Sequence, residues 1–184
     1  MEGLIESGAV SGVLDVTTTE WADELVGGTL SAGPTRLDAA GRAGVPAVVA
    51  PGCLDMVNFG EPQTVPARFA GRLFYQHNPH VTLMRTTPAE SAELGRILAA
   101  KVNAYRAPVT ILFPTKGLSA LGEPGQPFCD PEADAALLTA LRQNLYREVP
   151  LKVVDAAINE PAFSNACAGA LLTNIEAARH HRHG

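Results

Sequence analysis

Short runs of apolar residues alternate along the chain with stretches in which apolar residues recur every three or four positions. The runs predict buried strands, which we expect at 12–16, 46–50, 73–76, 109–113 and 151–155. The periodic stretches predict helices at 20–26, 34–43, 88–105, from 131 onward and at 161–178. Strands that alternate with helices are typical of a three-layer α/β/α, Rossmann-like domain with a mostly parallel sheet.

Some helix positions and ends are marked by individual residues. Thr87 and Glu90 flank a helix start in the spacing of a capping box, which predicts that the helix begins directly after Thr87. Trp21 and Leu25 are one turn apart, so we expect both on the buried face of their helix. Residues 1–8 read as the last turns of a helix that ends at Gly8, as if the chain began inside a larger domain.

The composition indicates one globular domain over residues 1–184, with 46% hydrophobic and 18% charged residues. The net charge of −5, from 14 basic and 19 acidic residues, disfavours nucleic-acid binding, which needs a basic face. The segment 179–184 is rich in His and Arg, and we expect a flexible tail there. No signal peptide or membrane-spanning run is present, so we expect no membrane association and a cytoplasmic location.

Polar side chains follow several of the predicted strands. In open parallel sheets, ligands bind outside the carboxyl ends of the strands, so these residues are the candidates for a site. Arg85 and Lys116 would neutralise a small anionic ligand, and the other candidates would orient it. The candidate ligand-binding residues are Thr17, Thr18, Thr19, Asp55, Asn58, His77, Asn78, Arg85 and Lys116.

Several of these residues, and Cys53 near them, also have a structural interpretation. Thr19 suits a helix N-cap, and Asp55 and Asn58, three residues apart, suit side-chain bonds within their own loop. Cys53 suits either a small buried side chain or the nucleophile of a Cys-His-acid arrangement with His77 and Asp55.

Other patterns are weaker. His77 and His80 lack a third ligand, so the sequence predicts no metal site. The three cysteines form no C-x-x-C pair, which argues against a zinc cluster and a disulfide framework. The loop 27–33 precedes a predicted helix start and suits either phosphate binding or a plain connection. The segment 51–71 is the longest irregular stretch, and loops of that length are usually functional or a packed cover.

Four long strings resemble the Tm-1-like family and together extend over most of the chain. They are 12–34, 51–60, 77–87 and 127–134. The family comprises bacterial and fungal proteins of unassigned function and a plant protein that inhibits tobamovirus RNA replication. Cys53 stands where family members usually have alanine, which weakens the nucleophile hypothesis, and Lys116 stands where they have arginine, which keeps the cation.

The resemblance implies a two-domain protein with two Rossmann-like domains, of which the first holds the nucleotide. This chain looks like the second domain without its opening strand and helix, so we expect a fragment, a split product or a chain completed by a partner. ATP with Mg²⁺ would then be held by the partner domain, and this chain would form one wall of an inter-domain cleft for a nucleotide or another small anionic ligand.

Two other functions remain open. One is a non-enzymatic interaction scaffold, in which the strand-end loops pack against the partner domain or form a homodimer. The other is a small-molecule hydrolase or lyase that uses Cys53 or His77.

Overall fold

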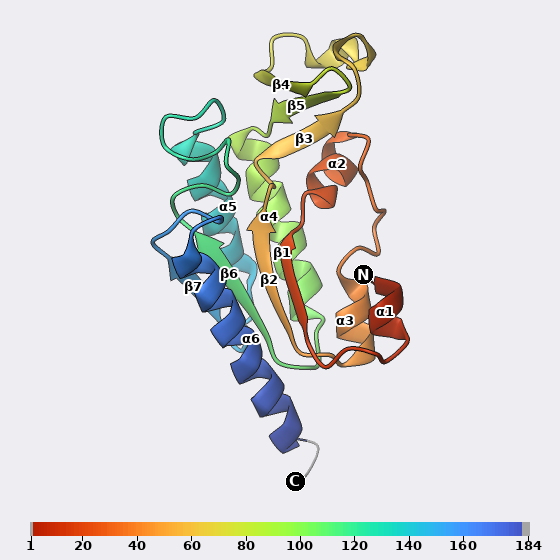
Figure 1. Cartoon of the computed structure of the whole chain (residues 1–184), viewed down its shortest axis with the longest axis vertical. Helices are drawn as coiled ribbons and strands as arrows, with labels where there is room; N and C mark the ends of the chain where they lie inside the picture. The colour runs from red at the N-terminus through yellow and green to blue at the C-terminus, as the bar shows by residue number, and fades with distance from the viewer. Residues whose placement is uncertain (1, 182–184) are drawn as a thin grey trace.

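A computed structural model describes residues 2–181 and contains a four-stranded parallel sheet in the order β1–β2–β6–β7 (Figure 1). The strands are β1 (Val13–Thr17), β2 (Ala47–Gly52), β6 (Val109–Pro114) and β7 (Leu151–Val154). Every residue of the two inner strands, β2 and β6, is buried. Parallel strands that are covered on both faces read as continuous apolar runs, so these two were visible in the sequence.

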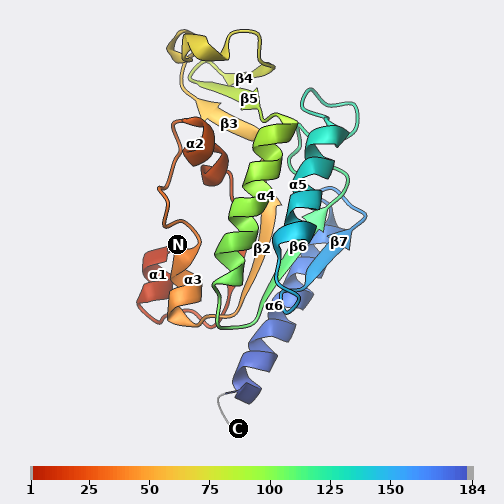
Figure 2. The same ribbon diagram turned by 180° about the vertical axis from the view of Figure 1, so that it is seen from behind.

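Helices cover both faces of this sheet, as Figures 1 and 2 show from opposite sides. One face carries α4 (Pro88–Asn103) and α5 (Pro131–Asn144) together with the shorter α2 (Glu20–Val26) and α3 (Asp38–Ala43). The other face carries α6 (Pro161–His181), which packs Phe163, Cys167 and Ala170 onto β2 and β6. The first helix, α1 (Glu2–Glu6), packs beside α3. The predicted three-layer α/β/α architecture with a parallel sheet is therefore confirmed.

A second sheet was not predicted. Its three antiparallel strands are ordered β3–β5–β4, with β3 at Met56–Phe59, β4 at Phe74–Asn78 and β5 at Val81–Arg85. Two short 3₁₀ helices, η1 (Pro62–Thr64) and η2 (Ala67–Phe69), connect β3 to β4. We call residues 56–85 the antiparallel lobe; it projects beyond the carboxyl ends of the parallel strands (Figure 1).

The lobe corrects two predictions. The apolar run at 73–76 is part of β4, which pairs antiparallel with β5 and lies outside the parallel sheet. The segment 51–71 is not irregular throughout, because it contains β3 and both 3₁₀ helices. The parallel sheet therefore has four strands instead of five.

Most helix ends agree with their local signals. The capping box at Thr87 is present: its side chain accepts from the Glu90 N–H and the Glu90 carboxylate accepts from the Thr87 N–H. The predicted helix at 34–43 starts only at Asp38, because Leu37 has a φ of 76° and interrupts the turn before it. A helix that ends before Gly8 is confirmed by α1, and Gly8 has a φ of 74°.

One prediction about a helix face was wrong, and the last helix is longer than predicted. Leu25 is 37% exposed, whereas Trp21 is buried, so only one of the two faces the core. The predicted tail 179–184 is helical as far as residue 181, where α6 ends, and 182–184 lie outside the described residues. Within residues 2–181, no helix is both long enough and apolar enough to cross a membrane.

Candidate functional site

The loops at the carboxyl ends of the parallel strands are hydrogen-bonded to one another. The Thr18 N–H donates to the Gly52 carbonyl at 3.0 Å, and the Thr18 hydroxyl donates to the Ala50 carbonyl at 3.0 Å. The Cys53 N–H donates to the Leu118 carbonyl at 2.8 Å, which joins the loops after β2 and β6. The buried Thr18 hydroxyl thus has a structural role, while Thr17 is exposed at the end of β1.

Asp55 lies in the loop between β2 and β3 and is fully buried. The Ser119 hydroxyl donates to Asp55 Oδ2 at 2.6 Å, and Oδ1 has no hydrogen-bond partner among residues 2–181. Burial raises the pKa of the Asp55 carboxyl, and the Ser119 hydrogen bond and the Arg85 charge act in the opposite direction. A Cβ on Gly122 would lie 2.6 Å from Asp55 Oδ2, so glycine is needed where that loop passes the carboxylate.

Arg85 connects the antiparallel lobe to the rest of the domain. Its Nε donates to the Phe128 carbonyl at 2.8 Å, its Nη1 to the Thr86 hydroxyl at 2.9 Å and its Nη2 to Asp134 Oδ1 at 2.7 Å. Burial raises the pKa of Asp134 to about 6 although Arg85 lowers it. We call Asp55, Arg85, Ser119 and Asp134 the Arg85 cluster. Because the Arg85 side chain is only 4% exposed and its guanidinium is hydrogen-bonded within the protein, Arg85 has a positioning role in this structure.

A pocket of about 230 Å³ lies beside the Arg85 cluster, between the loop after β6 and the first turns of α5. Lys116, Gly117, Gly122 and Asp134 are among its lining residues, and we call it the Lys116 pocket. Lys116 is 47% exposed, and its Nζ lies 3.0 Å from the exposed carboxylate of Asp155. That lysine lowers the pKa of Asp155.

Asn58 is hydrogen-bonded to Thr19 and to a buried acid, Asp23, which was not among the predicted site residues. Asp23 on α2 is fully buried, and its Oδ1 accepts from the Asn58 N–H at 2.8 Å and from Asn58 Nδ2 at 3.2 Å. Asn58 Nδ2 also donates to the Thr19 hydroxyl at 3.2 Å. Burial raises the pKa of Asp23. Thr19 occupies the predicted N-cap position of α2, but its hydroxyl makes no capping hydrogen bond. The contacts around Asp23 fix β3 to α2.

His77 and Asn78 are exposed at the end of β4, next to the turn into β5. Asn78 Oδ1 accepts from the His80 N–H at 2.8 Å within this turn. Since β4 does not belong to the parallel sheet, the prediction that these residues follow a parallel strand was wrong. Within residues 2–181 no hydrogen bond joins Cys53 to His77, and burial, with the charges of Asp55 and Glu20, raises the pKa of Cys53 to about 11.

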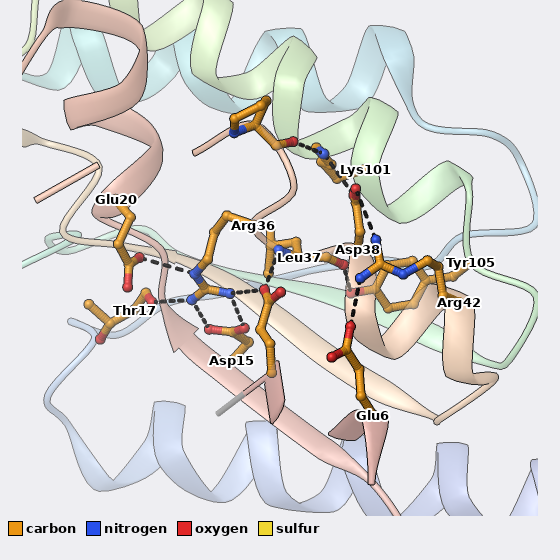
Figure 3. Close-up of polar contacts among 12 residues, drawn as sticks. Glu6, Asp15, Thr17, Glu20, Arg36, Leu37, Asp38, Arg42, Lys101 and Tyr105 are labelled. Carbon is orange, nitrogen blue, oxygen red and sulfur yellow. Dashed lines mark hydrogen bonds and ion pairs between the residues drawn. The ribbon is translucent and has the colours of Figure 1, made fainter. Parts of the chain in front are cut away.

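A buried ion network on β1 was also missed (Figure 3). Arg36 makes two hydrogen bonds to Asp15, at 2.6 and 2.7 Å, and both residues are more than 90% buried. Arg36 Nε lies 3.4 Å from Glu20 Oε2, and Nη2 donates to the Thr17 carbonyl at 3.3 Å. The network fixes the turn before α3 to β1. An acid in the middle of an apolar strand, such as Asp15, was the signal that could have revealed it.

Comparison with known proteins assigns the chain to a family. Residues 1–175 match the uncharacterised protein family (UPF0261) C-terminal domain. A UPF0261 protein of Clostridium tetani is 46% identical over 177 residues, which are 96% of this chain and 44% of the relative. One from Rhizobium meliloti is 48% identical over 172 residues, which are 92% of this chain and 43% of the relative.

A plant protein is also similar. The ToMV resistance protein Tm-1 of Solanum lycopersicum is 40% identical over 182 residues, 98% of this chain and 24% of the tomato protein. The chain thus spans less than half the length of each of these three relatives. These matches confirm the resemblance to the Tm-1-like family: the chain belongs to the UPF0261 family and corresponds to its C-terminal domain.

Proposed function

We propose that this domain forms one wall of a cleft that binds a nucleotide or another small anionic ligand together with a nucleotide-binding domain. The observation that carries the proposal is a half-exposed lysine, Lys116, at a pocket beside the carboxyl end of a parallel strand. Ligands of open α/β sheets bind in that position, and a lysine there suits an anion.

The ion pair of Lys116 is compatible with this role. Its partner Asp155 is 84% exposed, and exposed ion pairs contribute little to stability. The ammonium group can therefore exchange Asp155 for an anionic ligand group without uncovering a buried charge. Arg85 supports the site indirectly, because it holds Asp134, which lines the same pocket.

The size of the pocket favours a shared site. Pockets for small molecules usually measure about 300–1,000 Å³. The Lys116 pocket, at about 230 Å³, accommodates part of a nucleotide but not the whole molecule. The relatives are more than twice as long as the matched segment, which leaves room in them for a second wall.

The test is calorimetric titration of the chain with ATP, AMP and inorganic phosphate. The same titrations are repeated after addition of the separately produced amino-terminal half of the Clostridium tetani relative. We expect weak binding to the chain alone and at least about tenfold tighter binding with the second half, because two walls share the ligand.

Two lysine variants make the test specific. Lys116→Ala should weaken binding about tenfold, which is the usual scale for a lost charge-assisted hydrogen bond. Lys152→Ala is the matched control, because Lys152 is exposed on the neighbouring strand β7 and does not line the pocket. Equal weakening by both variants, or no binding even with both halves present, would contradict the proposal. In the latter case, scattering that shows the strand-end loops buried in a stable dimer would favour the scaffold function.

A further inference from the structure

The antiparallel lobe contains a second and larger pocket, of about 480 Å³, which shares no lining residue with the Lys116 pocket. It lies between one face of the lobe sheet and the segment 62–70, which carries the two 3₁₀ helices. Phe74, Gln76 and Thr82 line it from the sheet. The segment 62–70 belongs to the stretch 51–71, which the sequence predicts to be functional or a packed cover. It contributes no lining residue to the Lys116 pocket.

The walls of the pocket are mostly apolar and carry no charged residue. Pro62, Val65, Pro66 and Phe69 line it from the segment 62–70, and no charged residue of the described chain is among its lining residues. Phe69 is held in place by Phe59, whose ring centroid is 5.3 Å away. The two prolines restrict the backbone of the segment, so the pocket is largely preformed. Its volume falls in the range of sites for small organic molecules.

Thr82 supplies the buried polar group of the pocket, whereas the other polar lining residue, Gln76, is exposed. Thr82 lies on the central strand β5, opposite Gln76 of β4 and Phe59 of β3, and is only 4% exposed. Its hydroxyl has no hydrogen-bond partner in the part of the chain that the structure describes. A buried hydroxyl without a partner destabilises the fold, whereas valine has nearly the same shape without that penalty. A ligand that bonds to the hydroxyl would remove the penalty.

We propose that this pocket, which we call the Thr82 pocket, binds a small uncharged aromatic molecule that carries one hydrogen-bonding group. The ligand is uncharged because the lining offers no countercharge, and burying an unpaired charge is costly. It is small because the pocket measures about 480 Å³, and aromatic because the rings of Phe69 and Phe74 line the pocket. It carries a hydrogen-bonding group because the Thr82 hydroxyl, which both donates and accepts, is unpaired in the residues described.

The first experiment tests occupancy with N-phenyl-1-naphthylamine, an uncharged fluorescent probe with a single N–H donor. We expect saturable fluorescence enhancement with the wild-type chain. Ala70→Trp places an indole at the pocket and should weaken binding at least about tenfold, because Ala70 is an exposed lining residue. Ala100→Trp, at an exposed position on α4 away from this pocket, is the matched control and should stay within about twofold of wild type. Circular dichroism establishes that both variants are folded.

The second experiment tests the hydroxyl with Thr82→Val and a second probe, 1-benzylnaphthalene, in which a methylene replaces the N–H. We expect the variant to bind the amine about three- to tenfold more weakly and the hydrocarbon equally well or better. Equal effects on both probes would overturn the assignment of the hydroxyl. The pocket assignment would be overturned if Ala70→Trp bound the amine within twofold of wild type. It would also be overturned if the probe were displaced as the protein concentration rises, because a second copy would then occupy the pocket.

Discussion

Removal of the Arg85 charge should destabilise the protein in a manner that depends on pH. Arg85→Met keeps much of the side-chain volume but leaves the carboxylates of Asp55 and Asp134 without their shared cation. Removing one partner of a buried ion pair typically costs about 3–5 kcal/mol. We expect a loss of about 3 kcal/mol in the free energy of unfolding at pH 8, because Asp134 is 22% exposed and partly solvated.

The penalty should shrink at lower pH. In the folded wild type, Asp134 has a pKa of about 6, above the ordinary value of 3.8 that applies to the unfolded chain. Protonation of Asp134 therefore stabilises the fold, fully below pH 3.8, and this contribution is lost as the pH rises through 6. Without Arg85 the folded pKa should rise by a further one to two units, since a neighbouring opposite charge lowers a carboxyl pKa by about that much. At pH 5.5 the variant then holds a proton on Asp134, and about 2 kcal/mol of the penalty should be recovered.

Urea denaturation followed by circular dichroism at pH 5.5 and pH 8 measures both quantities. Arg72→Met is the matched control, because Arg72 makes a bidentate pair with Glu90. Burial raises the pKa of Glu90, but the hydrogen bonds from Arg72 and Thr87 outweigh it and leave that pKa below 4.5. In the wild type, stability from Glu90 is therefore lost only below that value, and the cost of Arg72→Met should change less between the two pH values than the cost of Arg85→Met. An equal cost of Arg85→Met at pH 5.5 and pH 8 would refute the coupling of Arg85 to these carboxyls.

Three further predictions concern single sites. Thr87→Ala should lower the free energy of unfolding by about 1 kcal/mol in urea denaturation, because it removes the capping box of α4; no change would contradict the capping role. Gly122→Ala should lower the free energy of unfolding by about 1–3 kcal/mol, because the new methyl group clashes with the buried Asp55 carboxylate. Gly169→Ala, in α6 with open space around it, should raise the free energy of unfolding by about 0.5–1 kcal/mol. Thermal denaturation of both variants would show whether the two effects have opposite signs. Iodoacetamide at pH 7.5 should alkylate the exposed Cys129 about tenfold or more faster than Cys53, whose thiol has a pKa of about 11, and mass spectrometry of timed samples would reveal the reverse order if Cys53 were an activated nucleophile.

The parallel sheet could be predicted from the sequence because its signals are local. Inner strands that are buried on both faces read as unbroken apolar runs, and helix ends such as Thr87 carry their capping residues beside them. The antiparallel lobe could not be predicted in the same way. The apolar run at the start of β4 resembles a parallel strand, and only its pairing with β5 fixes its true place. β3 was not predicted because the segment 51–71 contains several prolines and therefore read as irregular.

The candidate site was predicted less completely, since its contacts join distant parts of the chain. Asp55 and Arg85 were identified because charged residues near strand ends stand out in an apolar context. Their partners, Ser119 and Asp134, lie 64 and 49 residues further along, and nothing in their local sequence marks them. Nor does spacing reveal that Asn58 binds Asp23 on α2.

Asp134 is part of both the Arg85 cluster and the Lys116 pocket, so a variant of Asp134 cannot separate the role of the cluster from that of the pocket. Its carboxylate pairs with Arg85, which holds the antiparallel lobe, and the same residue lines the Lys116 pocket. A substitution of Asp134 would therefore disturb the lobe and the pocket together, and a loss of ligand binding would have two explanations. Lys116 makes its only side-chain hydrogen bonds, within residues 2–181, to the exposed Asp155, so its removal leaves the hydrogen bonds of the Arg85 cluster intact. Binding that is lost in Lys116→Ala with stability unchanged can only be attributed to the pocket.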